Sequence, residues 1–127
     1  MRIRRQFTVE GKDAYEGIAF RNAASEIRNP DGSVVFRQTD IEVPDEWSQV
    51  ASDVLAQKYF RKAGVPTALK AVPEEGVPEF LWRKAADGTE TTGERSAKQV
   101  FDRLAGTWAY GLEGRLFRRR GRRPGFL

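Results

Sequence analysis

The sequence predicts an α+β fold, with a small antiparallel β-hairpin or meander followed by two main helices. A turn sequence at 29–32 separates two stretches that are rich in β-branched and aromatic residues. Two later segments repeat apolar residues with helical spacing. The chain has 127 residues, the length of one small domain.

The hairpin is predicted at residues 25–37. The tetrapeptide Asn-Pro-Asp-Gly at 29–32 favours a turn, because proline presets φ and glycine accepts a positive φ. Residues 33–37 are β-branched and aromatic, which is typical of a returning strand. Ile41 and Val43 predict a short third extended piece.

The first helix is predicted over residues 47–63. Its apolar stripe consists of Val50, Val54, Leu55 and Phe60. Cations gather towards its end, where the helix dipole favours them, and Gly64 suits the position just after a helix.

Residues 65–95 are predicted to form an irregular loop with one aromatic clamp at 79–83, because prolines and glycines interrupt the segment. A second helix is predicted over 96–110, with Ser96 as its N-cap. The predicted core consists of Ile27, Val35, Val54, Leu55, Phe60, Trp82, Phe101 and Leu104.

The composition excludes several kinds of chemistry. The chain contains no Cys and no His, so thiol nucleophiles, disulfides, thiolate zinc sites and imidazole acid–base catalysis are absent from it. No apolar stretch has the length of a membrane-spanning helix, and the N-terminus lacks the apolar core of a secretory signal. We expect a soluble, cytoplasmic protein without a membrane partner.

The positive charge is concentrated at one end of the chain. The net charge is +4, but residues 111–127 hold six arginines against the single acid Glu113, so residues 1–110 sum to −1. An Arg-rich segment can make salt-sensitive phosphate contacts. One hypothesis is therefore a small nucleic-acid-binding module that uses this tail.

Other candidate sites have simpler interpretations. The acidic pairs at 45–46 and 74–75 adjoin prolines and are interpreted as solvated loop charges. Aromatic residues interleaved with cations at 58–62 and 80–84 could stack bases, but core packing explains them more simply. No glycine-rich phosphate-binding motif is present. We assign no catalytic residue and no metal ligand, and the cofactor-binding residues stay unknown.

Several longer motifs resemble the N-terminal domain of class II, adenosylcobalamin-dependent ribonucleotide reductases. The resemblance covers about residues 2–110, and its most specific parts are the stretches 25–36, 47–66, 76–83 and 99–108. It implies a domain at 1–110 that packs on the reductase catalytic barrel, normally within the same chain.

The resemblance also implies what the parent enzyme does. That family, which consists of oxidoreductases, reduces ribonucleotides to deoxyribonucleotides for DNA synthesis through a cobalamin-generated cysteine thiyl radical and a reducing cysteine pair. The substrates are either di- or triphosphates. Because this chain has no Cys, we expect a scaffold that is inactive alone, with adenosylcobalamin and ribonucleotides bound by the full-length enzyme.

The resemblance stops after Tyr110. The family continues there with an aromatic, glycine-rich run. One permitted coding of residues 111–120, read one nucleotide later, spells Gly-Trp-Lys-Gly-Gly-Tyr-Phe-Asp-Gly, which resembles that run. We therefore expect residues 111–127 to be a disordered, out-of-frame tail on a fragment of the reductase, which binds nucleic acid only if the tail is native.

Overall fold

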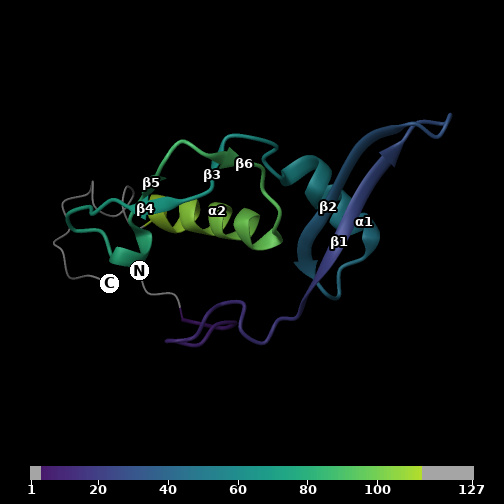
Figure 1. Cartoon of the computed structure of the whole chain (residues 1–127). Coiled ribbons are helices and arrows are strands. Elements are labelled where there is room, and N and C mark those ends of the chain that lie inside the picture. The colour runs from purple at the N-terminus through teal and green to yellow at the C-terminus, as the bar shows by residue number, and fades with distance from the viewer. Residues whose placement is uncertain (1–3, 113–127) are drawn as a thin grey trace.

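The computed structural model describes residues 4–112, where antiparallel two-stranded sheets and two main helices confirm the predicted α+β class (Figure 1). The prediction for the Arg-rich tail lies outside the described residues from residue 113 onward and stays a prediction. The elements in chain order are β1 (Phe20–Arg28), β2 (Val34–Pro44), α1 (Gln49–Val54), the π-helical turn η1 (Leu55–Tyr59), β3 (Val65–Pro66), β4 (Leu69–Ala71), the 3₁₀ turn η2 (Glu79–Leu81), β5 (Lys84–Ala86), β6 (Thr91–Thr92) and α2 (Ala97–Tyr110).

The predicted hairpin is confirmed and is longer than the sequence indicated. β1 and β2 pair from Phe20 opposite Pro44 to Arg28 opposite Val34, so the expected third extended piece is the second half of β2. Gly32 has a φ of +88°, as the turn sequence requires. The backbone N–H of Asn29 donates to the carbonyl of Ser33 over 2.8 Å and closes the turn.

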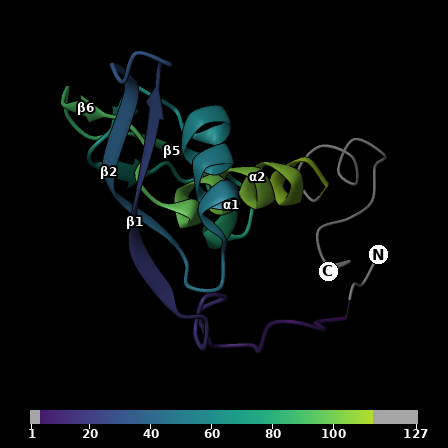
Figure 2. The ribbon, with the colours of Figure 1, turned by 90° about the vertical axis from the view of Figure 1, so that its right-hand side faces the viewer.

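A β-bulge at Asp40 decides which side chains of the hairpin are buried. Asp40 has a φ of 57°, and the register shifts here, between Ala23 and Ser25 of β1. Ile41 and Val43 are fully buried on the face that α1 covers (Figure 2). Because the extra residue reverses the alternation, Val35 lies on the outer face at 60% exposure, and its predicted core position is wrong.

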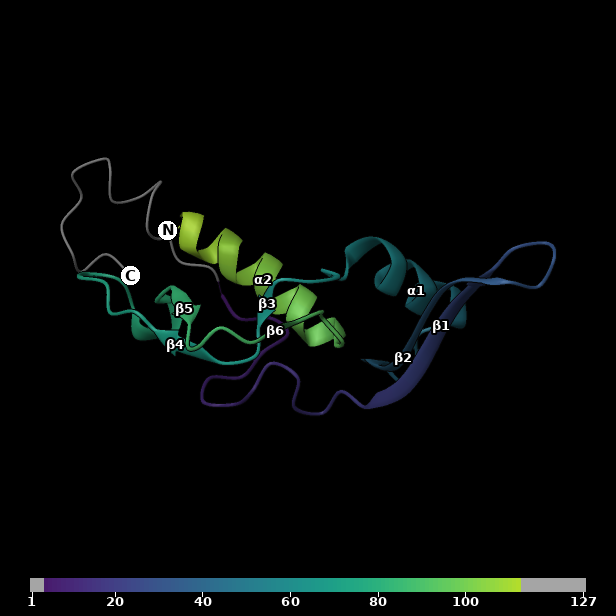
Figure 3. The ribbon, with the colours of Figure 1, turned by 45° about the horizontal axis from the view of Figure 1, so that its top comes forward.

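The hairpin tip extends beyond the helical layer. Figures 1 and 3 show the turn end of β1 and β2 projecting past α1. Ile27 is 38% exposed there, so its predicted core position is also wrong. The physical reason is that no other described element covers this part of the sheet.

The first helix begins two residues later than predicted, at Gln49, and ends earlier. Ser48 caps α1, its Oγ accepting from the Ala51 N–H over 3.2 Å. The helix then widens into η1 and stops at Tyr59, not at residue 63, because Phe60 turns extended and buries its ring in the core. Gly64 has a positive φ but lies beyond the helix end and does not cap it.

The apolar stripe predicted for this helix is only half correct. Leu55 is buried, as predicted, together with the small residues Ser52 and Ala56. Val50 and Val54 face away from the sheet, at 72% and 46% exposure, so Val54 is not a core residue. Small side chains on the covered face let a helix lie close to a sheet, which sequence periodicity alone does not reveal.

The segment 65–95 is not simply an irregular loop. β3 pairs with β6 and β4 pairs with β5, so the chain leaves and returns along an antiparallel path, with η2 near its far end. Of the predicted aromatic clamp, Leu81 is buried, and Trp82 is half-buried with its Nε1 donating to the carbonyl of Val77 over 2.9 Å. Phe80 is 78% exposed.

The second helix is confirmed. Ser96 caps α2 in a capping box with Gln99, which is a purely local device. Val100 is 2% exposed in the core, and Phe101 and Leu104 pack against that core as partly buried residues. The Phe101 ring meets Trp47 edge-on, with 5.8 Å between the ring centroids.

Two glycines provide a matched test of this packing. A Cβ on Gly93 would lie 2.8 Å from the backbone oxygen of Lys62, whereas a Cβ on Gly106, within α2, would meet nothing within 4 Å. We expect Gly93→Ala to destabilise the fold by about 1–3 kcal/mol, and Gly106→Ala to stabilise it by up to about 1 kcal/mol. Urea unfolding of the two variants measures both changes. Equal effects of the two substitutions would contradict the close approach at Gly93.

Candidate functional site

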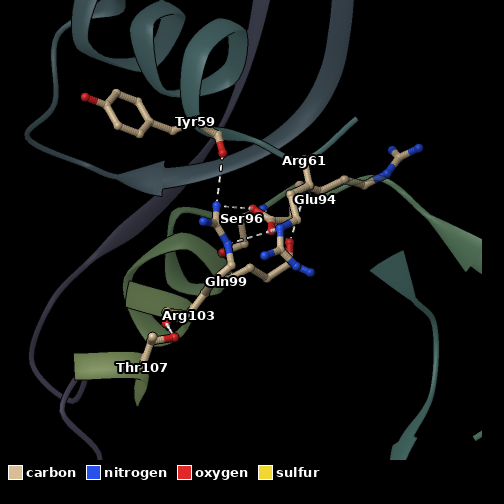
Figure 4. Close-up of polar contacts among 8 residues, drawn as sticks. Tyr59, Arg61, Glu94, Ser96, Gln99, Arg103 and Thr107 are labelled. Atoms are coloured by element: carbon tan, nitrogen blue, oxygen red, sulfur yellow. Dashed lines mark hydrogen bonds and ion pairs between the residues drawn. The ribbon is translucent and has the colours of Figure 1, made fainter. Parts of the chain in front are cut away.

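Glu94 is the one charged residue that is buried in the part of the chain the structure describes, at 3% exposure. Figure 4 shows its carboxylate beside the side chains of Arg61 and Arg103. Arg103 Nε lies 3.0 Å from Oε1 and Arg103 Nη2 lies 3.2 Å from Oε2, a bidentate pair. Arg61 Nε lies 3.9 Å from Oε1.

Three parts of the fold hold Glu94 in place, through its backbone as well as its carboxylate. The Glu94 N–H donates to the carbonyl of Arg61 over 2.8 Å, just after the end of η1. Gln38 of β2 donates from Nε2 to the Glu94 carbonyl over 3.0 Å. Arg103 of α2 also donates to the carbonyl of Tyr59 over 3.0 Å, which satisfies a helix-end acceptor. The Glu94 cluster, defined as Glu94, Arg103, Arg61 and Gln38, thus joins the hairpin, the first helix and α2.

The geometry of the Glu94 cluster suits structure rather than reaction chemistry. Both carboxylate oxygens accept hydrogen bonds from one guanidinium, so neither oxygen is left without a partner. Within residues 4–112, no group of three or more His, Cys, Asp or Glu side chains could hold a metal ion. The cluster is therefore best described as a buried clamp between elements.

A second network attaches the N-terminal segment to α2. The Tyr15 hydroxyl donates to Asp102 Oδ1 over 2.6 Å and to the carbonyl of Lys98 at 3.3 Å. Burial, and next the hydrogen bond and negative charge of Asp102, raise the pKa of Tyr15, so the phenol stays protonated and keeps donating. The Lys98 ammonium lies 4.3 Å from the centre of the Phe20 ring. These contacts are an anchor for residues before β1.

Among the aromatic and basic residues at 58–62, Phe60 and Lys62 pack within the domain, as the simpler interpretation predicted, whereas Tyr59 is 56% exposed. Phe60 is 4% exposed. The Lys62 ammonium bonds the carbonyl of Ala56 and lies 4.6 Å from the centre of the Phe36 ring, and burial lowers its pKa. These side chains are therefore occupied within the domain.

The acidic pairs of the sequence show no catalytic geometry. Glu74 accepts from the Tyr110 hydroxyl over 2.8 Å and lies 3.5 Å from Arg83 Nε, so it ties the 65–95 segment to the end of α2. Asp45 and Glu46 are exposed at the entry to the first helix. The structure thus gives no reason to assign them chemistry.

Sequence reasoning missed Glu94 and Arg103. They lie in a region with many charges, and neither belongs to a recognisable motif. The one nearby signal in the sequence is Gly93. The structure shows why this position needs a glycine, because a Cβ there would lie 2.8 Å from the backbone oxygen of Lys62.

No described helix has both the length and the apolar character needed to cross a membrane.

Comparison with known proteins supports the resemblance seen in the sequence. Residues 21–122 match the family model of the class II vitamin B12-dependent ribonucleotide reductase. Vitamin B12-dependent ribonucleotide reductases from Agrobacterium fabrum and Bradyrhizobium diazoefficiens are 61% and 60% identical, each over 92% of this chain and 10% of the relative. The enzyme of that name from Streptomyces clavuligerus is 32% identical over 80% of this chain and 11% of its own length.

These relatives decide between the two hypotheses raised by the sequence. The chain spans about a tenth of the length of the curated relatives it matches. Neither the relatives nor the described residues support the nucleic-acid-binding alternative. The chain belongs to the class II vitamin B12-dependent ribonucleotide reductase family, of which it represents the N-terminal domain.

Proposed function

We propose that this chain is the scaffold segment of a cobalamin-dependent enzyme that reduces ribonucleotides to deoxyribonucleotides. The observation that carries the proposal is the family match over residues 21–122, in a chain without a single cysteine. Radical reduction of ribonucleotides in this family depends on cysteines, so the reacting groups lie in the remainder of the enzyme. This segment contributes structure and positioning.

The residues present do not fit a cobalamin site. Imidazole and thiolate side chains are frequent protein ligands of first-row transition metals such as cobalt, and the chain has neither. Its one buried carboxylate, among the residues that the structure describes, is taken up by Arg103. We therefore assign no residue of this chain to the cofactor, which the proposal places on the rest of the reductase.

The polar network supports a scaffold role. The Glu94 cluster, the Tyr15–Asp102 bond and the Glu74–Tyr110 bond each join segments that are distant in the sequence. A network that is satisfied within the domain fixes the relative positions of its elements. Such rigidity is what a catalytic neighbour needs from a supporting domain.

A domain exchange tests the proposal. Residues 1–112 of this chain are put in place of the matching segment of the Agrobacterium fabrum reductase. We expect the chimera to reduce ribonucleotides with added adenosylcobalamin and dithiol, because the segment is 61% identical. A deletion of the segment is the negative control. Turnover by the isolated 127-residue chain, or an inactive but folded and cobalamin-binding chimera, would contradict the scaffold role.

The Glu94 cluster gives a separate prediction. Glu94→Gln leaves Arg103 without its charge partner, and we expect the free energy of unfolding to fall by about 2 kcal/mol, below the full value for a buried pair because the Arg103 side chain is 26% exposed. Urea unfolding measures this. The control Glu26→Gln, at a pair with more exposed arginines, is expected to cost no more than about 0.5 kcal/mol.

The same variant separates structure from chemistry. In the chimera, Glu94→Gln is expected to leave the turnover number unchanged at a temperature where the protein stays folded. A loss of turnover without a loss of stability would show that Glu94 takes part in the reaction.

A further inference from the structure

The apolar face of α2 is longer than the surface that covers it. Val100, Leu104, Trp108 and Leu112 are spaced four residues apart, so they form a stripe that winds around the helix by about 40° at each step. Val100 is 2% exposed and Leu104 is partly buried, but Trp108 is 66% exposed and Leu112 is 44% exposed. The same stripe thus begins in the core and ends in solvent.

The arrangement of the elements explains this change. The first turns of α2 meet the hairpin and the first helix, through the Glu42 N–H bond to the Arg95 carbonyl and the contact of Phe101 with Trp47. In Figures 1 and 3, α2 then runs away from the hairpin towards β4 and β5. The Tyr110 hydroxyl ties the end of the helix to the 65–95 segment. The Trp108 side is left uncovered by the described residues.

The composition of this end of α2 suits contact with protein. Residues 104–112 contain no charged side chain, although 31% of the whole chain is charged. A helix face that stays in water normally carries charges. The turn η2 contacts α2, and its Phe80 side chain is 78% exposed. Phe80 therefore adds another large apolar side chain to the exposed surface. Tryptophan and phenylalanine are enriched at the centres of protein interfaces.

We infer that Trp108 and Leu112, which we term the uncovered face, form the surface on which the catalytic part of the reductase packs, with the partly buried Leu104 at its edge. This inference rests on the proposed function. The relatives extend over about nine tenths of their length outside the matched segment. The family match identifies this chain as their N-terminal domain, so their catalytic part follows it in the same polypeptide. The uncovered face lies on α2, the last helix that the structure describes in chain order.

The test compares the solvent accessibility of Trp108 in two proteins. Hydroxyl-radical footprinting, read by mass spectrometry, is applied to the isolated chain at a concentration where it is monomeric and to the active chimera described above. We expect oxidation of Trp108 to be several-fold slower in the chimera. Tyr59, which is 56% exposed on the first helix, is the control and is expected to react equally in both. Equal oxidation of Trp108 in both proteins would overturn the inference.

The outcomes separate this inference from the proposed function. An active chimera with an accessible Trp108 supports the scaffold role and overturns the docking surface. An inactive chimera with a protected Trp108 supports the docking surface and contradicts the scaffold role. Protection of Trp108 that appears only when the isolated chain dimerises, and not in the chimera, would identify a second copy of the chain as the occupant and overturn the inference.

The variant Trp108→Ser gives a second measurement. In the chimera it is expected to speed proteolytic release of the N-terminal segment, because an interface side chain is lost, while Tyr59→Ser leaves the rate unchanged. Trp108 is already mostly exposed within the domain, so the isolated variant is expected to keep its melting temperature. Equal release rates for the two variants would contradict the assignment.

Discussion

The fold depends on the ion pair between Glu94 and Arg103. Burial of a carboxylate is costly unless its charge and hydrogen-bonding capacity are met, and here one guanidinium meets both oxygens. The same arginine satisfies the carbonyl of Tyr59 at the end of the first helix. A single side chain thereby joins the end of the first helix, the returning end of the 65–95 segment and α2.

This dependence follows from the small size of the apolar core. Few large apolar side chains are buried among the described residues, and small residues such as Ala56 and Ala97 complete the core. The large ones are Ile41, Val43, Leu55, Phe60, Leu81 and Val100. A domain of this length buries a modest fraction of its surface. Its polar contacts therefore contribute more to fixing one arrangement of its helices and strands. Polar ties at Tyr15 and at Glu74 extend the same principle to the two ends of α2.

The family assignment shows that related segments belong to a much longer polypeptide. Relatives named as vitamin B12-dependent ribonucleotide reductases are about ten times longer than the segment they share with this chain. The described residues present satisfied networks inside and an apolar stripe that leaves the core along α2. Both features support the scaffold role proposed above.

The sequence by itself determined the features whose causes are local. The turn at 29–32, the two serine caps and the existence of both helices depend on residues within a few positions of one another. The lack of Cys excludes thiol chemistry on these 127 residues. Only the tertiary structure decided the features that join distant residues. The bulge at Asp40 reverses which side of β2 is buried, and η1 ends the first helix early so that Phe60 can enter the core. The Glu94–Arg103 pair joins charges that look solvated in the sequence. Burial, strand register and charge pairing depend on what lies across from a residue in space, and the pattern of its neighbours along the chain does not contain that information.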